Sequence, residues 1–295
     1  MELLRGYELS RLTTIRIGGR SDMFAEPSTP EEIKELVVMS RDMDVPLFVV
    51  GGGSNVIFGD FKGLVISTRR LSGIEVEPEN GRLTVKALAG TPLRELIALS
   101  VKENLKGLYR LVGFPATVGG AVSMNAGAFG VEVSDFLKRV VFLNWEGEVV
   151  EAEASELSFG YRSSPFPKIG LVLSCTFEFE KSEHPIQEEF NSIRVRRKST
   201  QPIDKPTSGS TFKNPYPEYA GRLLEEVGMK SCRVGGVAFS EKHSNFIINL
   251  GEGSFSDVVK LIGEAKRRVY EEFGIELEEE VKLIEDSGLD GWKVL

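Results

Sequence analysis

Three consecutive glycines, Gly51 to Gly53, lie between two runs of β-branched and aromatic residues, LFVV (47–50) and VIF (56–58). Such runs predict strands, and the stretch 29–45, which ends before Pro46, predicts a helix. A dinucleotide-binding fingerprint needs a helix directly after the glycines, and the lysine of a P-loop is absent. The segment GGGSN is therefore predicted to be a loop between strands. Its amides can form an anion-binding nest, or the loop can simply connect the two strands.

A second glycine-rich segment, GFPATVGGAVSMNAGAFG, spans residues 113–130 and carries no charged residue. It has too much glycine for a stable helix interior and is too apolar for an exposed linker. Such a segment lets the backbone approach a large flat group, or another backbone, closely.

Length and composition narrow the class of protein. A chain of 295 residues predicts two or three domains, and its net charge of −8 argues against nucleic acid as a partner. No apolar run reaches the ~18–20 residues of a membrane span, and the first residues lack the pattern of a signal peptide. We therefore expect a cytoplasmic protein without membrane insertion. With two cysteines and two histidines at unsuitable spacings, no zinc-type metal site is expected.

The second half of the chain alternates short strands and helices. Strands are predicted from 140 to 180, and the polar stretch 181–190 indicates a boundary. The basic segment RVRRKSTQPIDK (194–205) is either a solvated helix face or a site for a phosphorylated small molecule. Further elements are predicted as a helix near 218–227, a strand at 244–250, an amphipathic helix from 256 to Gly274 and a strand over 275–285.

Ser210 lies in PTSGSTFKNP, a stretch whose glycine, serine, asparagine and proline residues are typical of a tight turn. A nucleophilic serine requires a histidine base held by a third group. The chain offers only His184 and His243, and no G-x-S-x-G elbow surrounds Ser210. A turn is favoured over a nucleophile, and a third role stays open from the residues alone.

Seven segments in collinear order resemble the flavin-dependent UDP-N-acetylenolpyruvoylglucosamine reductases, the MurB family, over nearly the whole chain. They are TTIRIGG (13–19), GGGSN (51–55), GFPATVGGAVSMNAGAFG (113–130), FGYRSSPF (159–166), RRKSTQPIDKPTSGSTFKNP (196–215), EKHSNFIIN (241–249) and LEEEVKLI (277–284). The chain looks like the shorter form of the family, which lacks an extra substrate-clamping loop.

The resemblance implies an α+β protein. Residues 1–182 would form an FAD-binding domain of the vanillyl-alcohol-oxidase type, with two α/β lobes at about 1–66 and 67–182. Residues 183–285 would form an α+β substrate domain whose last strand can return to the FAD domain, and 286–295 would be a C-terminal tail. A monomer is expected.

The resemblance also implies the reaction. NADPH would reduce FAD, and the hydride would pass to the enolpyruvyl ether of UDP-N-acetylglucosamine, giving UDP-N-acetylmuramate for peptidoglycan synthesis. Arg162 and Glu280 would stabilise the charge that develops on the substrate, and Ser210 would protonate C2. Two rivals stay open: another FAD oxidase or dehydrogenase acting on a small hydroxy compound, and a nucleotide-binding module without catalysis.

By the same resemblance, two groups of residues are expected to bind the ligands. The FAD contacts would be Gly51, Gly52, Gly53, Ser54, Asn55, Val56, Gly113, Pro115, Thr117, Gly119, Gly120, Ala121, Asn125, Ala126 and Gly127. The substrate contacts would be Arg197, Lys213, Asn214, His243 and Lys282. From the residues alone, Arg162 would be interpreted as part of a surface ion pair. His243 would be interpreted as a core histidine whose hydrogen bonds are satisfied.

Overall fold

The first part of the chain forms a four-stranded sheet, and its strand at Leu47–Val50 is buried on both faces. The structure is a computed structural model that describes residues 1–79 and 82–285, and the predicted tail at 286–295 lies outside them. Phe48 and Val50 pack into one core cluster and Leu47 and Val49 into another, which explains the uninterrupted apolar strand. The strand order is β1 (Leu3–Glu8), β2 (Arg20–Ala25), β5 (Phe61–Ser67) and β3 (Leu47–Val50), with only β1–β2 antiparallel. Helix α1 (Pro30–Asp42) connects β2 to β3.

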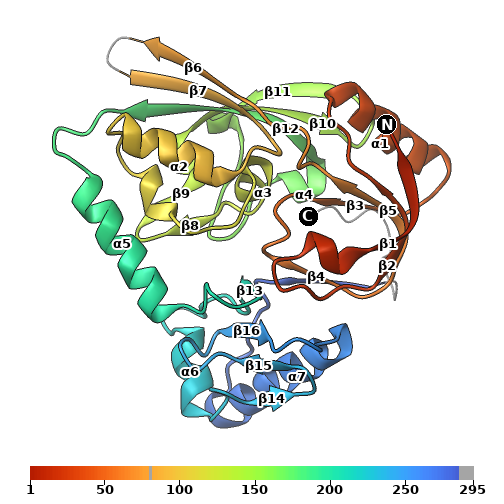
Figure 1. Ribbon diagram of the computed structural model, residues 1–295, viewed down its shortest axis with the longest axis vertical. Coiled ribbons are helices and arrows are strands. Elements are labelled where there is room, and N and C mark those ends of the chain that lie inside the picture. The colour runs from red at the N-terminus through yellow and green to blue at the C-terminus, as the bar shows by residue number, and fades with distance from the viewer. Residues whose placement is uncertain (80–81, 286–295) are drawn as a thin grey trace.

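The second sheet has five antiparallel strands, and Figure 1 shows helices α2 and α3 together on one side of it. One core cluster includes residues of both this sheet and the N-terminal sheet, so the two lobes share a hydrophobic interior. The strand order is β11 (Val149–Glu153), β10 (Leu137–Asn144), β12 (Gly170–Glu180), β7 (Arg82–Leu88) and β6 (Ile74–Glu79). The smaller elements are α2 (Leu93–Lys102), α3 (Val118–Ser123), β8 (Gly127–Ala128), β9 (Val131–Glu132), α4 (Phe166–Ile169) and the 3₁₀ turns Leu9–Leu12, Leu108–Leu111, Val133–Phe136 and Ala154–Glu156.

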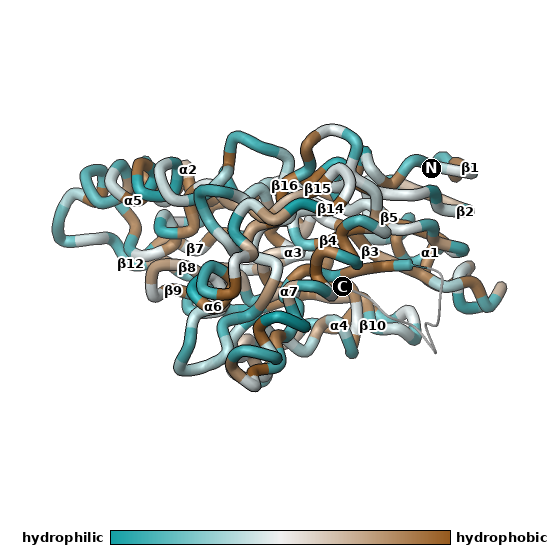
Figure 2. The backbone as a smooth tube through the Cα atoms, turned by 90° about the horizontal axis from the view of Figure 1, so that it is seen from below, coloured by the Kyte–Doolittle hydropathy of each residue, from teal (hydrophilic) through white to brown (hydrophobic). Residues whose placement is uncertain are grey.

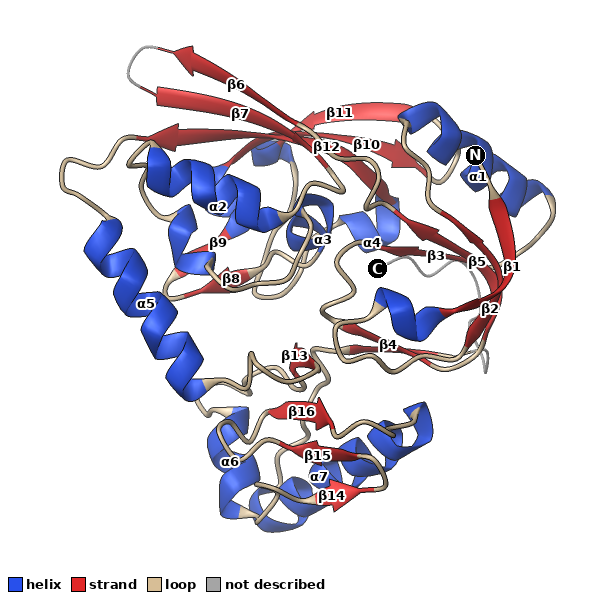
Figure 3. Ribbon diagram, viewed as in Figure 1, coloured by secondary structure: helices blue, strands red, loops and turns tan. Residues whose placement is uncertain are grey.

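A third sheet and two helices form the C-terminal domain, which Figure 3 shows below the other two sheets. Helix α5 (Gln187–Thr200) runs from the end of the second sheet toward this domain (Figure 1). The sheet is antiparallel in the order β13 (Thr207–Ser210), β16 (Phe246–Asn249), β15 (Val237–Phe239) and β14 (Arg233–Val234), and its helices are α6 (Ala220–Glu226) and α7 (Phe255–Phe273). This mixture of helices and sheets confirms the predicted α+β class.

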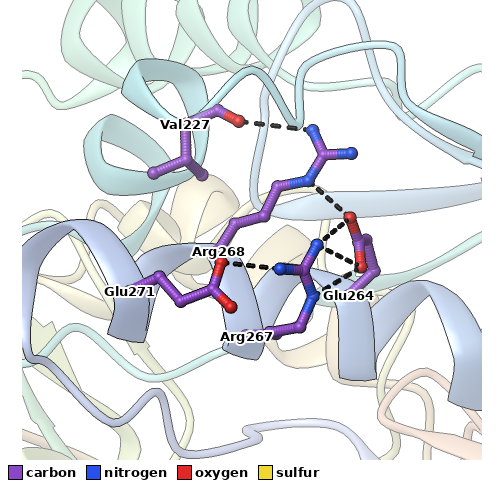
Figure 4. A network of polar contacts seen from close by, with 5 residues as sticks. All are labelled: Val227, Glu264, Arg267, Arg268 and Glu271. Atoms are coloured by element: carbon purple, nitrogen blue, oxygen red, sulfur yellow. Dashed lines mark hydrogen bonds and ion pairs between the residues drawn. The ribbon is translucent and has the colours of Figure 1, made fainter.

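Helix α7 has the amphipathic character that its sequence predicts. Hydrophobic and hydrophilic residues alternate along its trace in Figure 2. Ser254 caps its first turn, and Gly274 ends it with a φ of +67°. On the outer face, Glu264 accepts hydrogen bonds from Arg267 and Arg268, and Arg268 also reaches the carbonyl of Val227 at 3.4 Å (Figure 4). The last contact ties α7 to the end of α6.

The prediction of a strand over residues 275–285 is wrong for most of that range. Only β17 (Lys282–Ile284) is a strand, and it pairs in parallel with β4 (Val56–Phe58) of the N-terminal half. Before it, Glu279 forms a single bridge with Phe212. The segment bends because successive residues bond to different partners instead of one continuous neighbour.

Two further predictions of local structure are corrected. Residues 113–130 contain helix α3 despite their glycines, because Thr117 caps it and the amides of Val118 and Gly119 donate to the carbonyls of Thr91 and Ala89. These bonds outweigh a helix propensity deficit of about 1 kcal/mol per glycine. The turn expected at Ser210 is wrong, since Ser210 ends strand β13 and pairs with Phe246 beside a register shift.

Within the described ranges, no helix has the length and apolar character needed to cross a membrane.

Candidate active site

The loop at residues 51–55 joins β3 to β4, as the sequence predicts. Most of its carbonyl groups accept hydrogen bonds from other parts of the protein. The carbonyls of Gly51 and Gly52 accept hydrogen bonds from Arg69 at 3.1 and 3.0 Å. The carbonyl of Gly53 accepts from the Thr14 amide at 2.9 Å, and that of Asn55 accepts from Lys282 at 3.0 Å. In contrast, the amides of residues 51–55 donate to no acceptor in the described part of the chain. Free amides pointing away from bonded carbonyls are what an anion-binding nest requires.

This loop lies directly against the second glycine-rich segment. A Cβ at Gly52 would lie 2.4 Å from the carbonyl oxygen of Pro115, and one at Gly51 would lie 2.2 Å from Oγ1 of Thr117. Real Cβ atoms do not approach so closely, so both positions require glycine. The structure therefore brings together the two segments that the resemblance assigns to the cofactor.

The helical part of the second segment has its amides engaged. The amide of Gly119 donates to the carbonyl of Ala89 at 2.8 Å, and that of Gly120 to Oγ1 of Thr117 at 3.4 Å. The amide of Ala121 donates to the Thr117 carbonyl. Gly119 is required for packing, because a Cβ there would lie 2.7 Å from that of Ala89. These residues offer no free amide, and their contact with a cofactor stays a prediction.

Arg162 and Glu280 form a largely buried ion pair. Nε of Arg162 lies 2.7 Å from Oε1 of Glu280, with side chains 19% and 14% exposed. Arg162 also donates to the carbonyl of Gly127 at 2.8 Å and lies over the ring of Tyr161. Desolvation raises the pKa of Glu280 above its ordinary value, although neighbouring cations act in the opposite direction.

The backbone of Glu280 connects three parts of the site. Its amide donates to the carbonyl of Thr211 at 2.8 Å, directly after Ser210. Its carbonyl accepts from Nδ2 of Asn55 at 3.0 Å. The glycine loop, the ion pair and Ser210 are thus held in one arrangement, and Ser210 is half-buried.

Ser210 opens onto a polar cavity of about 570 Å³. The cavity is lined by Ser210, Asn214, Tyr219, Gly221, Arg222, Glu225, Glu226, Lys242, His243, Ser244 and Asn245. The ring of His243 packs 4.7 Å from that of Phe246, and its Nδ1 accepts from the Asn245 amide. Burial lowers the pKa of His243, which favours the neutral imidazole. Two predicted substrate residues, Asn214 and His243, therefore share this cavity with Ser210.

The remaining predicted substrate residues lie in two places. Lys213 follows the Ser210 segment and pairs with Glu278. Lys282 is half-buried nearby, and desolvation together with Lys213 lowers its pKa. The guanidinium of Arg197 instead lies 4.3 Å from the ring centroid of Phe114, in the second glycine-rich segment.

Arg197 is buried without a compensating carboxylate among the described residues. It is 6% exposed, its Nε has no hydrogen-bond partner, and desolvation lowers its pKa to about 10. The adjacent Arg196 and Lys198 are exposed. The interpretation of the basic segment as a solvated helix face therefore holds for these two residues and not for Arg197.

Two residues that shape the site, Arg69 and Asn245, were not predicted from the sequence. Arg69 binds the glycine-loop carbonyls, and it stands in a stretch without a recognisable motif. Asn245 donates to the carbonyl and accepts from the amide of Phe212, at 2.8 and 2.9 Å, beside Ser210. Asn245 stands in the segment EKHSNFIIN, so only that resemblance pointed to its region.

Known proteins match this chain over its whole length. An FAD binding domain model matches residues 21–153, and the C-terminal domain model of UDP-N-acetylenolpyruvoylglucosamine reductase matches residues 201–292. A protein of that name from Aquifex aeolicus (strain VF5) is 58% identical over 295 residues, covering 100% of this chain and 99% of the relative. One from Moorella thermoacetica is 41% identical, covering 96% and 93%. The crystal structure of UDP-N-acetylenolpyruvylglucosamine reductase from Thermus caldophilus is similar with a TM-score of 0.79 and 33% identity, covering 96% and 98%.

Proposed function

This chain belongs to the UDP-N-acetylenolpyruvoylglucosamine reductase family, and we propose that Arg162, Ser210 and Glu280 carry its reaction. The enzyme reduces the enolpyruvyl ether of UDP-N-acetylglucosamine to UDP-N-acetylmuramate in peptidoglycan precursor synthesis, with FAD as cofactor and NADPH as hydride donor. The observation that carries the assignment of residues is the Arg162–Glu280 ion pair, whose backbone bonds to the residue after Ser210.

The first domain supplies residues that fit FAD. The free amides of residues 51–55 lie against residues 115–117, so a dinucleotide pyrophosphate can be bound by backbone groups without a side chain intervening. FAD held there would supply the hydride chemistry between NADPH and C3 of the enolpyruvyl group. Arg69 holds the carbonyls of this loop, which turns the amides toward the anion.

Arg162 stabilises the negative charge that the reaction creates. Hydride addition at C3 places charge on C2, and the substrate carboxylate delocalises it. A guanidinium fork suits a planar carboxylate because it donates two parallel hydrogen bonds. Glu280 and the Gly127 carbonyl hold Arg162 before substrate arrives, so little reorganisation is needed.

Ser210 supplies the proton to C2. A serine hydroxyl is a weak acid, but an enolate-like carbon is basic enough to take its proton. Lys213, three residues further along the chain, is the cation that we assign to stabilise the alkoxide that this leaves, and its ammonium pairs with Glu278. The position of Ser210 at the cavity wall supports this role.

The polar cavity beside Ser210 takes the rest of the substrate. Asn214 and His243 line it and offer hydrogen bonds to the UDP-sugar. Lys213 and Lys282 add positive charge near the carboxylate and diphosphate. Arg197 lies apart from them, and its buried unpaired guanidinium suits an anionic group of a ligand beside Phe114.

Domain limits and cellular context are part of the proposal. We place the FAD domain at 1–182 and the substrate domain at 183–285, supported by sheets that draw their strands from 3–67, 74–180 and 207–249. The return of β17 to β4 supports a substrate domain whose last strand joins the FAD domain. The protein acts in the cytoplasm as a monomer that binds no nucleic acid. The net charge of −8 supports the last of these points.

An anaerobic experiment tests the function. NADPH should bleach the flavin in the absence of any other substrate, and the enolpyruvyl ether of UDP-N-acetylglucosamine should then restore the colour. Bleaching by a small hydroxy compound, together with no reoxidation by the enolpyruvyl ether, would instead identify an oxidase of the same cofactor fold. A protein that binds no added FAD would contradict both enzyme assignments.

A further inference from the structure

Asn125 has a fully buried side chain whose amide donors are both used within the protein. It follows helix α3 with a φ of +44°, a left-handed conformation that asparagine tolerates better than most residues. Its Nδ2 donates to Oε2 of Glu132 at 2.7 Å and to the carbonyl of Gly160 at 2.9 Å. Its Oδ1 accepts from the amide of Ser134 at 3.3 Å. Since an amide group has two donors, none remains for a flavin.

One of these bonds fixes the turn that carries Arg162. Gly160 and Ser163 exchange two backbone hydrogen bonds of 3.0 Å, with Tyr161 and Arg162 between them. Arg162 has a φ of +52°, so this turn holds it in a left-handed conformation that arginine rarely adopts. Asn125 bonds to the first residue of the turn.

The same segment also holds the tip of Arg162. Nη2 of Arg162 donates to the carbonyl of Gly127, two residues after Asn125. Position 127 has no room for a side chain, because a Cβ at Gly127 would lie 3.2 Å from Nη1 of Arg162 and 2.8 Å from the Val131 carbonyl. Residues 125–127 therefore fix both the backbone of the turn and the direction of its guanidinium.

We propose that Asn125 is a positioning residue for Arg162, a role that rests on the proposed function of Arg162 itself. To stabilise the substrate carboxylate, the guanidinium of Arg162 must lie at hydrogen-bond distance from it. A displacement of the guanidinium by about 1 Å can lower the rate ~10²-fold. Asn125 limits that displacement by joining the end of α3 to the turn at 160–163. In this proposal the side chain of Asn125 serves the site through Arg162 and not through a hydrogen bond to the flavin.

The chain contains a matched control at Asn104. This residue follows helix α2 with a φ of +55°. Its Nδ2 donates to the carbonyls of Ser182 and His184 at 3.0 and 3.2 Å, and its Oδ1 accepts from the amide of Ile186 at 3.1 Å. The local structure repeats that of Asn125, but its partners belong to the connection before α5 and not to the site.

The test compares Asn125→Gly with Asn104→Gly. Glycine accepts the left-handed backbone without strain, so each variant loses only its side-chain bonds. Both should unfold at a lower temperature than wild type and retain FAD. Asn125→Gly should slow flavin reoxidation by the enolpyruvyl ether about 10²-fold, with flavin reduction by NADPH near normal, and Asn104→Gly should change neither step. Loss of FAD in Asn125→Gly, equal slowing of both steps, or the same result from both variants would overturn the proposal.

A double-mutant cycle shows whether Asn125 acts through Arg162. In an Arg162→Ala background, Asn125→Gly should slow reoxidation no further, because the group that it positions is gone. The same fold-loss in both backgrounds would refute the mechanism. If Asn125→Gly does not fold at the assay temperature, both variants are assayed at a lower temperature, where the same contrast between the two half-reactions is expected. A wild-type enzyme that the enolpyruvyl ether fails to reoxidise would count against the proposed function and not against the geometry.

Discussion

Oε1 of Glu280 lies 2.7 Å from Nε of Arg162, although 118 positions separate the two residues in the chain. The contact depends on the return of the chain to its N-terminal half, where β17 pairs with β4 and the Lys282 amide bonds to the Asn55 carbonyl. The pair that we propose to act on the substrate is therefore anchored to the loop that we propose to bind the cofactor. Changes at the ion pair and at the loop should affect different steps of the reaction.

Arg162→Lys should keep the positive charge and lose the fork. A lysine ammonium cannot donate two parallel hydrogen bonds to a carboxylate and cannot also hold the Gly127 carbonyl. Rapid-reaction measurements should show flavin reoxidation by substrate slowed about 10²-fold, comparable to the loss of a preorganised donor, with reduction by NADPH changed much less.

Arg139→Lys is the matched control for that change. Arg139 is 44% exposed and pairs with Glu151 and Glu153 on the second sheet, where exposed ion pairs contribute little. It should leave both half-reactions at wild-type rates. Equal slowing of the two half-reactions by Arg162→Lys would show that Arg162 does not act specifically on the enolpyruvyl group.

Gly52→Val should abolish FAD retention while the C-terminal domain stays folded. A Cβ at this position would lie 2.4 Å from the carbonyl oxygen of Pro115, so the loop must move away from residues 115–117. The displaced amides can then no longer converge on a pyrophosphate. The flavin absorbance of the purified protein and its affinity for added FAD measure the effect.

Gly263→Ala is the corresponding control, because a Cβ there meets no atom within 4 Å. Gly263 lies inside α7, where alanine should stabilise the helix by about 0.5–1 kcal/mol. The variant should keep its flavin and unfold at a slightly higher temperature. Normal flavin content in a folded Gly52→Val protein would refute the assignment of the loop.

His243 should make the folded protein sensitive to acid. Burial lowers its pKa below the ordinary value of 6.5, so the unfolded chain binds a proton in a pH range where the folded chain does not. The stability that the neutral imidazole contributes is complete above pH 6.5 and is lost as pH falls through the lowered pKa.

Thermal unfolding between pH 5 and pH 7.5 checks this expectation. His243→Gln should show a smaller fall in Tm on acidification than wild type, because it has no buried imidazole to protonate. His184→Gln should keep the wild-type slope, since His184 lies exposed before α5. A His243→Gln protein with the full wild-type slope would assign the acid sensitivity to other groups.

The sequence predicted the glycine loop between β3 and β4 because strand periodicity and glycine chemistry are local signals. It could not predict Arg69, whose bonds to Gly51 and Gly52 exist only after the chain has folded. The alternation in residues 275–285 suggested one strand. The backbone of residues 278–281 instead bonds to residues 211–213, and that of Lys282 bonds to Asn55, so no single neighbour continues along the segment. The roles of the site residues came from the family resemblance, since no spacing links them.

Ser210→Ala isolates the transfer of one proton. Ser210 ends β13 and opens onto the polar cavity. Its hydroxyl forms no hydrogen bond with any described group. If the residue only shaped the strand end, alanine would be nearly harmless to both half-reactions. If it only bound substrate, the affinity would weaken and saturating substrate would restore the rate.

If Ser210 protonates C2, NADPH should still bleach the flavin of Ser210→Ala at close to the wild-type rate. Reoxidation by the enolpyruvyl ether should then slow by ~10²–10⁴-fold, the usual range for general acid catalysis. The loss should not depend on substrate concentration. Ser210→Cys should recover part of the rate, because a thiol can also donate a proton and alanine cannot. Turnover of Ser210→Ala within a few-fold of wild type would leave Ser210 with a structural role at the end of β13 and would require another donor for C2.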